Sequence, residues 1–163
     1  MVGVPKDREE IMRVSLMAGI TALTLGLASP ALAGDDVTTH VADAEFADVV
    51  IDLEDAIVNR GYKIDYRGYI GEMLKRTAED VGGTKALYRN AEFFQFCSAV
   101  VSRKAMEADI GNIAYCPYVI FAYEAEADPG KVVVGFRRLP DGPGRDDVNA
   151  LLDEITGEAA GDM

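Results

Sequence analysis

The chain has 163 residues, with 28 acidic and 16 basic side chains, and its formal net charge at pH 7 is −12. Nucleic acids and anionic lipids are bound mainly through basic patches, so this charge argues against both as partners. Two cysteines, Cys97 and Cys116, and one histidine, His40, are the only thiol and imidazole groups in the chain.

The first 33 residues have the pattern of an export signal. Met17–Leu27 is an apolar run that is too short to span a bilayer, and Ala31-Leu32-Ala33 offers a small-x-small cleavage site. Three acids between positions 6 and 10 are unusual in a leader, so Met12 is an alternative start. We expect cleavage after Ala33 and a periplasmic product without a membrane span, the alternative being an uncleaved signal anchor. The net charge of the cleaved product would still be −12, because the leader contains three basic and three acidic residues.

Residues 34–163 have the length of one domain that can bury its own core. In chain order, hydrophobic periodicity and turn signals predict alternating strands and helices that end in a hairpin and a closing helix. The predicted strands are 37–42, 62–67, 86–97, 118–124 and 131–138, and the predicted helices are 43–61, 71–81, 98–109 and 146–155.

Two of these elements are defined most clearly. The first helix has apolar residues at the helical spacing, Asp43 as its expected N-cap and Gly61 as its stop. Residues 118–124 are apolar on both faces, which predicts a central strand, and Asp128-Pro129-Gly130 then has the residues of a type II turn. The order indicates an α+β fold: a single-domain sandwich of helices on one face of a mostly antiparallel sheet.

Several of these features together resemble the DUF302 domain-of-unknown-function family. They are Cys97 at a strand end, the short helix after it, Cys116-Pro117, the aromatic strand closing in Tyr123-Glu124, and a first helix ending in Asn59-Arg60-Gly61-Tyr62. The resemblance covers roughly Val37 to Ile155 and implies a TATA-binding-protein-like fold that is compatible with a homodimer. The two-cysteine form, FCSA…CPY, looks like an exported branch. The resemblance implies no activity and no catalytic residue.

Cys97 and Cys116 are compatible with three kinds of site. A structural disulfide is favoured in an exported protein, and closing a loop of 19 positions would contribute about 3 kcal/mol. A redox-active pair is the first alternative, because Cys97 lies at a predicted helix start near Arg103 and Lys104, although no Cys-x-x-Cys motif is present. A soft-metal site is the second, with His40 and the methionines Met73, Met106 and Met163 as further ligands, but no ligand spacing supports it.

Catalytic motifs are not found. One histidine, which we interpret as solvent-facing, and no Gly-x-Ser-x-Gly argue against a hydrolytic triad, and Cys-x-x-Cys-His is absent. Glu92, Glu124 and Glu126 are interpreted as surface charge, and the glycine pairs lack the phosphate-loop pattern. We therefore expect no catalytic residue, no metal and no cofactor.

Aromatic residues are the remaining candidates for a functional surface. Tyrosine combines an apolar body with a polar tip, so an aromatic set can line a ligand pocket or an interface, or can simply form the core. An apolar sheet face left uncovered by helices would favour binding. The candidate surface consists of Tyr66, Phe94, Phe96, Tyr115, Tyr118, Phe121 and Tyr123.

Two functions follow as hypotheses. The first is a non-enzymatic periplasmic binding or accessory protein that is cross-linked by a Cys97–Cys116 disulfide. It would bind a small ligand, a periplasmic protein or a second copy of itself. The second is a thiol-dependent redox or soft-metal-handling protein that uses the same cysteines.

Overall fold

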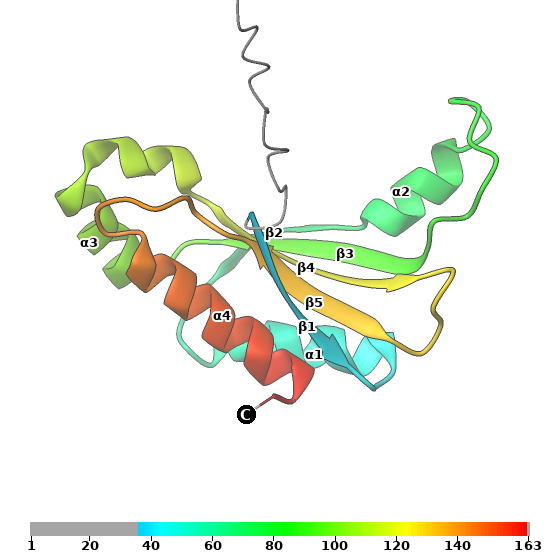
Figure 1. The fold of residues 1–163 in the computed structure, drawn as a ribbon, viewed down its shortest axis with the longest axis horizontal. Coiled ribbons are helices and arrows are strands. Elements are labelled where there is room, and N and C mark those ends of the chain that lie inside the picture. Colours follow the sequence, from blue (N-terminus) through cyan, green and yellow to red (C-terminus); the bar gives the residue numbers. More distant parts are fainter. Residues whose placement is uncertain (1–35, 163) are drawn as a thin grey trace, which may run out of the picture. The chain divides into compact units, whose positions relative to one another are not determined.

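The computed structural model describes residues 36–162, so the predicted leader, its cleavage site and the alternative start lie outside the described residues. Five strands form one antiparallel sheet in the order β1-β5-β4-β3-β2 (Figure 1). The strands are β1 (Val37–Ala42), β2 (Ile64–Gly68), β3 (Tyr88–Phe96), β4 (Tyr118–Ala125) and β5 (Val132–Arg137). The helices are α1 (Phe46–Val58), α2 (Ile70–Thr77), α3 (Ala99–Ala108), the 3-10 helix η1 (Ile110–Tyr115) and α4 (Asp146–Ala160).

Helices α1 and α4 pack against each other and cover one face of the sheet (Figure 1). Period-two alternation directs Ile120 and Ala122 of β4, and Val134 and Phe136 of β5, toward these helices, and all four are buried. From α1 and α4 the core receives the buried side chains Val49, Leu53, Ile57, Val148, Leu152 and Ile155. The expected α+β architecture with helices on an antiparallel sheet is confirmed.

Strand β4 lies in the middle of the sheet, as the apolar residues on both of its faces predict. The turn to β5 has Gly130 at φ 84°, the left-handed conformation that the predicted type II turn requires of its glycine. The side chain of Glu124 accepts hydrogen bonds from the backbone N–H of Gly130 (2.9 Å) and from Asn90 (3.0 Å). These bonds hold the pKa of Glu124 below its ordinary value, so this acid stabilises the turn and the β3–β4 pair.

The structure differs from the sequence-based prediction at one helix start and adds one short helix. Helix α1 begins after Glu45, not after Asp43, and no side chain caps its first turn. The segment between α3 and β4, for which no element was predicted, forms η1, whose buried Asn112 donates to the carbonyls of Ala105 (2.7 Å) and Pro143 (2.9 Å). Both acceptors come from other elements, so local sequence preference does not predict the helix.

None of the helices between residues 36 and 162 has the length and apolar character needed to cross a bilayer.

An apolar groove on the open face of the sheet as the candidate functional site

The face of the sheet opposite α1 and α4 carries a row of aromatic and apolar side chains that are partly buried or exposed. Phe121 and Tyr123 of β4 point to this face, because the residues next to them in the strand point into the core. Phe93 of β3 and Val133 of β5 point to the same face, because they pair with Phe121 and Tyr123 in the register of the sheet. Tyr66 of β2 packs against Phe93 with ring centroids 5.7 Å apart. We call this surface the open face.

Helix α2 lies over one end of the open face and packs on β3 (Figure 1). Gly71 makes this close approach possible, because a Cβ there would lie 2.8 Å from the backbone nitrogen of Ala91. Ile70 and Leu74, on the side of α2 toward the sheet, are partly buried, whereas Met73 is exposed. No residue of α2 is fully buried, so the helix is held mainly by this one apolar face.

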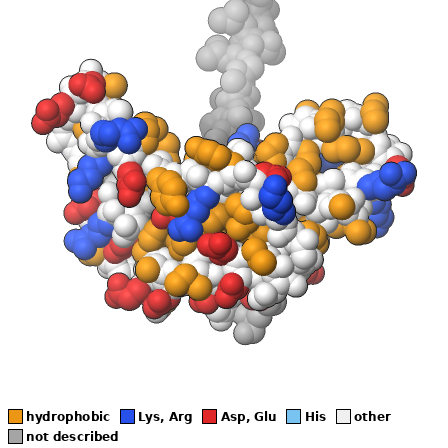
Figure 2. Space-filling view, turned by 180° about the vertical axis from the view of Figure 1, so that it is seen from behind, with side chains coloured by type: hydrophobic (Ala, Val, Ile, Leu, Met, Phe, Trp, Pro, Cys, Tyr) orange, Lys and Arg blue, Asp and Glu red, His pale blue; other side chains and the backbone are white. Residues whose placement is uncertain are grey.

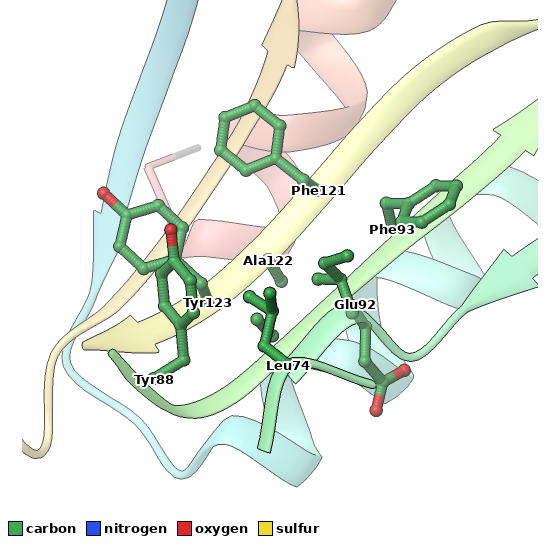
Figure 3. Close-up of a pocket in the computed structure, with 9 residues that line it drawn as sticks. Leu74, Tyr88, Glu92, Phe93, Phe121, Ala122 and Tyr123 are labelled. Carbon is green, nitrogen blue, oxygen red and sulfur yellow. The ribbon is translucent and has the colours of Figure 1, made fainter. Parts of the chain in front are cut away.

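The space between α2 and the sheet is a groove of about 360 Å³ (Figure 3). We call it the aromatic groove. Its lining residues are Ile70, Leu74, Tyr88, Ala91, Glu92, Phe93, Phe121, Ala122 and Tyr123. The molecule seen from behind shows hydrophobic side chains, interspersed with charged ones, between its two upper projections (Figure 2).

The aromatic rings of the groove are fixed by one another and by glycines in the neighbouring strands. Tyr88 and Tyr123 pack edge to face with centroids 5.5 Å apart, and Phe121 stacks on Tyr123 at 6.1 Å. A Cβ at Gly135 would lie 2.8 Å from Cζ of Phe121, so this ring occupies the space above the glycine. Gly68 has the same relationship to Phe93, where a Cβ would lie 2.2 Å from the ring. The two glycines therefore allow the rings of Phe121 and Phe93 to pack directly against the backbone of the neighbouring strands.

The groove contains almost no charge. Glu92 is its one ionisable acid, but its carboxylate points away from the groove (Figure 3) and accepts a hydrogen bond of 2.6 Å from Nε of Arg67. The hydroxyls of Tyr88 and Tyr123 are the other polar side-chain groups among the lining residues. The site therefore suits an apolar ligand that needs at most one or two hydrogen bonds.

A second depression of about 480 Å³ adjoins the aromatic groove and shares Tyr123 with it. It is more polar, because Asp43, Asp128 and Lys131 line it, and Nζ of Lys131 lies 3.3 Å from the carboxylate of Asp128. Val41, Ala125 and Val133 complete its lining. Tyr123 is thus in contact with both depressions.

The structure divides the predicted aromatic surface between the two faces of the sheet. Tyr66, Phe121 and Tyr123 lie on the open face as expected of a surface. Phe94, Phe96 and Tyr118 point to the helices and belong to the buried core, so their inclusion is corrected. Tyr115 packs against the guanidinium of Arg145, 4.6 Å from the ring centroid.

Sequence reasoning missed Phe93 and Tyr88, together with Ile70 and Leu74 of α2. Strand alternation could have found Phe93, since it must face away from Phe94 and Phe96. The part played by α2 has no local signal, because it depends on where the chain after β2 crosses the sheet.

Cys97 and Cys116 form a disulfide, with Cα atoms 6.4 Å apart, and no cysteine in the described structure is free. Helix α3 and η1 lie between them in the chain, and the separation satisfies the geometric limit of about 7 Å. Both residues are partly buried. The bond ties the end of β3 to the start of β4.

His40 is not solvent-facing, which corrects the interpretation from sequence. It lies between β1 and α4, with Nδ1 2.7 Å from Asp162 and Nε2 3.0 Å from Asp153, and its side chain is 20% exposed. Among residues 36–162, no group of three or more His, Cys, Asp or Glu side chains is arranged to hold a metal ion.

No protein-family model and no curated protein matches the chain in sequence. Among solved structures, it is similar to an uncharacterized conserved DUF302 protein from Bacillus stearothermophilus, with a TM-score of 0.54. The match covers 78% of this chain and 94% of the other, at 11% sequence identity. The chain has the DUF302 fold. At this identity the likeness concerns the fold alone, so the residues of the aromatic groove have to be understood from this chain's own geometry.

Proposed function

We propose that this protein is a periplasmic, non-enzymatic binding or accessory module that holds a small, uncharged, largely apolar ligand in the aromatic groove. The observation that carries the proposal is the open face itself: helices cover one side of the sheet, whereas the other keeps an aromatic surface with α2 over one end. A ligand there would remove apolar surface from water, which is favourable by about 25 cal/mol per Å².

The size and charge of the groove narrow the ligand class. Its volume of about 360 Å³ is near the lower end of ligand pockets, which span about 300–1,000 Å³. A net charge of −12 disfavours anions as ligands, and no basic side chain lines the groove to offset this. An uncharged molecule with one aromatic ring system or a short apolar chain fits these conditions.

The disulfide supports the same proposal as a structural element. It joins the ends of two strands, β3 and β4, that both contribute side chains to the groove, and so it limits their relative movement. The thiol-dependent alternative needs the pair to open and one thiolate to be stabilised. Among the described residues, the side-chain hydrogen bond of this pair is the one between the hydroxyl of Ser102 and Sγ of Cys116 (3.8 Å), and no basic side chain hydrogen-bonds to either sulfur.

Nile red, an uncharged dye whose fluorescence rises in apolar surroundings, tests the proposal directly. We expect saturable binding by the wild type and at least about a tenfold weaker affinity for Leu74→Glu, because a carboxylate would have to be buried against the ligand. Met73→Glu is the matched control: it adds the same charge on the neighbouring, exposed residue of α2 and should bind as the wild type does.

Thermal unfolding of both variants ensures that they are compared as folded proteins. Equal dye affinity in the wild type, Leu74→Glu and Met73→Glu would exclude the aromatic groove as the site. Native mass spectrometry of the purified wild type, followed by organic extraction, should in addition show an uncharged small molecule that is absent from Leu74→Glu.

A further inference from the structure

The two edge strands of the sheet differ in how they are protected. Strand β2 has a register shift between Ile64 and Tyr66 and carries the charged residues Asp65 and Arg67, which are features that discourage pairing with another strand. Strand β1, with the sequence VTTHVA, pairs with β5 over six consecutive residues without a shift and contains no proline, lysine or bulge. Val37 and Val41 on this edge are 48% and 53% exposed. By these criteria β1 is an unprotected edge.

The backbone of β1 offers a regular set of unused hydrogen-bonding groups. The N–H of Arg138 donates to the carbonyl of Asp36 at 2.8 Å, which makes Asp36 and Arg138 a hydrogen-bonded pair in the register of β1 and β5. Hydrogen-bonded and non-hydrogen-bonded pairs alternate in an antiparallel ladder. Thr38, His40 and Ala42 therefore bond to β5, whereas the N–H and C=O groups of Val37, Thr39 and Val41 point away from the sheet.

No described residue outside the sheet satisfies these outward groups by a backbone hydrogen bond. They are centred on Thr39, with a valine two residues away on each side. We propose that a second copy of this chain pairs with β1 in antiparallel orientation, about a two-fold axis that is perpendicular to the sheet and passes midway between Thr39 of one copy and Thr39 of the other. Thr39 then faces Thr39 of the second copy, and Val37 faces Val41 of the second copy, so every outward group finds its partner.

The dimer joins the two sheets into one continuous sheet. Because the axis is perpendicular to the sheet, both open faces lie on the same side, and Val41, which lines the more polar depression, lies at the junction. The facing valines cover the exposed apolar side chains of each edge. Negative charge opposes the association, because Asp153 and Asp162, which both contact His40 of β1, lie near this edge. Salt screens this repulsion and should therefore strengthen the dimer.

Sedimentation of the protein recovered from expression of the full chain, at high salt, gives the first test. We expect a dimer for the wild type and for Thr39→Ser, which keeps the backbone N–H, and a monomer for Thr39→Pro, which removes it. Proline is tolerated on an edge strand where the N–H points outward, so the monomer should keep its fold and its circular dichroism spectrum.

Cysteine cross-linking tests the register. Because Cys97 and Cys116 are bonded, Thr39→Cys introduces a free thiol that would face its own copy in a hydrogen-bonded pair, where Cα atoms are about 5.5 Å apart, within disulfide range. We expect a disulfide-linked dimer on mild oxidation. Val41→Cys is the control, since its copies would be about 14 Å apart at about 3.4 Å per residue. A mixture of Val37→Cys and Val41→Cys should cross-link as a heterodimer.

A wild type that remains monomeric at its highest soluble concentration would overturn the proposal. So would a dimer that Thr39→Pro leaves intact, or one in which Val41→Cys cross-links and Thr39→Cys does not, since both results would place the contact elsewhere.

Discussion

The hydroxyl oxygens of Ser102 and Tyr118 lie 2.9 Å apart and connect α3 to the first residue of β4. Both side chains are buried, and Sγ of Cys116 lies 3.8 Å from the same serine oxygen. Burial raises the pKa of Tyr118 above its ordinary value, and the hydrogen bond with Ser102 opposes this rise only in part. The tyrosine is therefore a neutral phenol that needs a buried partner.

Removing either hydroxyl should lower the free energy of unfolding. We expect Ser102→Ala to lower the free energy of unfolding by about 1–3 kcal/mol, because the Tyr118 hydroxyl would stay buried without this partner. Tyr118→Phe should have a similar effect, and the double variant should cost less than the sum of the two single changes. Urea denaturation of the four proteins gives the coupling free energy. Strictly additive effects would mean that the bond contributes nothing.

The disulfide should act on stability and not on binding. Replacing both cysteines, Cys97→Ser with Cys116→Ser, should lower the free energy of unfolding by about 3 kcal/mol, since the reduced chain regains loop entropy in the unfolded state. Nile red affinity should be unchanged at a temperature where the variant is folded. Alkylation of the untreated wild type should give no labelled thiol until a reductant is added.

A thiol-dependent protein would behave differently. Rapid alkylation without reductant, or a folded double-serine variant that has lost a measurable redox or metal-binding property of the wild type, would contradict the structural role of this pair.

The free energy of unfolding should depend on pH because of His40, which lies between β1 and α4. Burial by itself lowers the pKa of His40, but the hydrogen bonds and charges of Asp162 and Asp153 outweigh it and raise the pKa above its ordinary value. A raised pKa in the folded state means that the charged imidazole stabilises the fold. This contribution is complete below the unfolded value of about 6.5 and is lost as pH rises through the folded value.

The matched comparison is wild type against His40→Gln, which can still form a hydrogen bond but cannot be charged. The wild type should be more stable than the variant by up to about 1 kcal/mol near pH 5.5–6, and the difference should shrink toward pH 8–9. Chemical denaturation at each pH measures it. A difference that grows with rising pH would show that the neutral form is the one that the fold stabilises.

Gly71 should set the distance between α2 and the sheet. A Cβ at this position would lie 2.8 Å from the backbone nitrogen of Ala91, so Gly71→Ala should push the helix away and widen the aromatic groove. Because no residue of α2 is fully buried, we expect a small loss of stability and a clear loss of Nile red affinity. Lys75→Ala, an exposed change on the same helix, is the control and should alter neither. An unchanged affinity for Gly71→Ala would show that α2 does not define the site.

Local patterns predicted most elements but did not predict which partners they meet. The i, i+3, i+4 spacing of apolar residues is enough to identify α1, and a strand that is apolar on both faces, such as β4, has to lie inside a sheet. Asn112 and Arg145 are 33 residues apart, and the bond between them that helps to hold η1 has no signal in either segment. The same holds for His40 and Asp162, which are separated by 122 residues.

The sequence by itself determined the α+β class, the central strand and the acidic charge that argues against anionic partners, because each depends on neighbouring residues or on composition. Only the tertiary structure decided which aromatic side chains form the core and which remain on the open face. It also decided that α2 covers one end of that face and that β1 lies at an edge. These outcomes depend on strand order and on the path of the chain over the sheet, which periodicity within a segment does not specify.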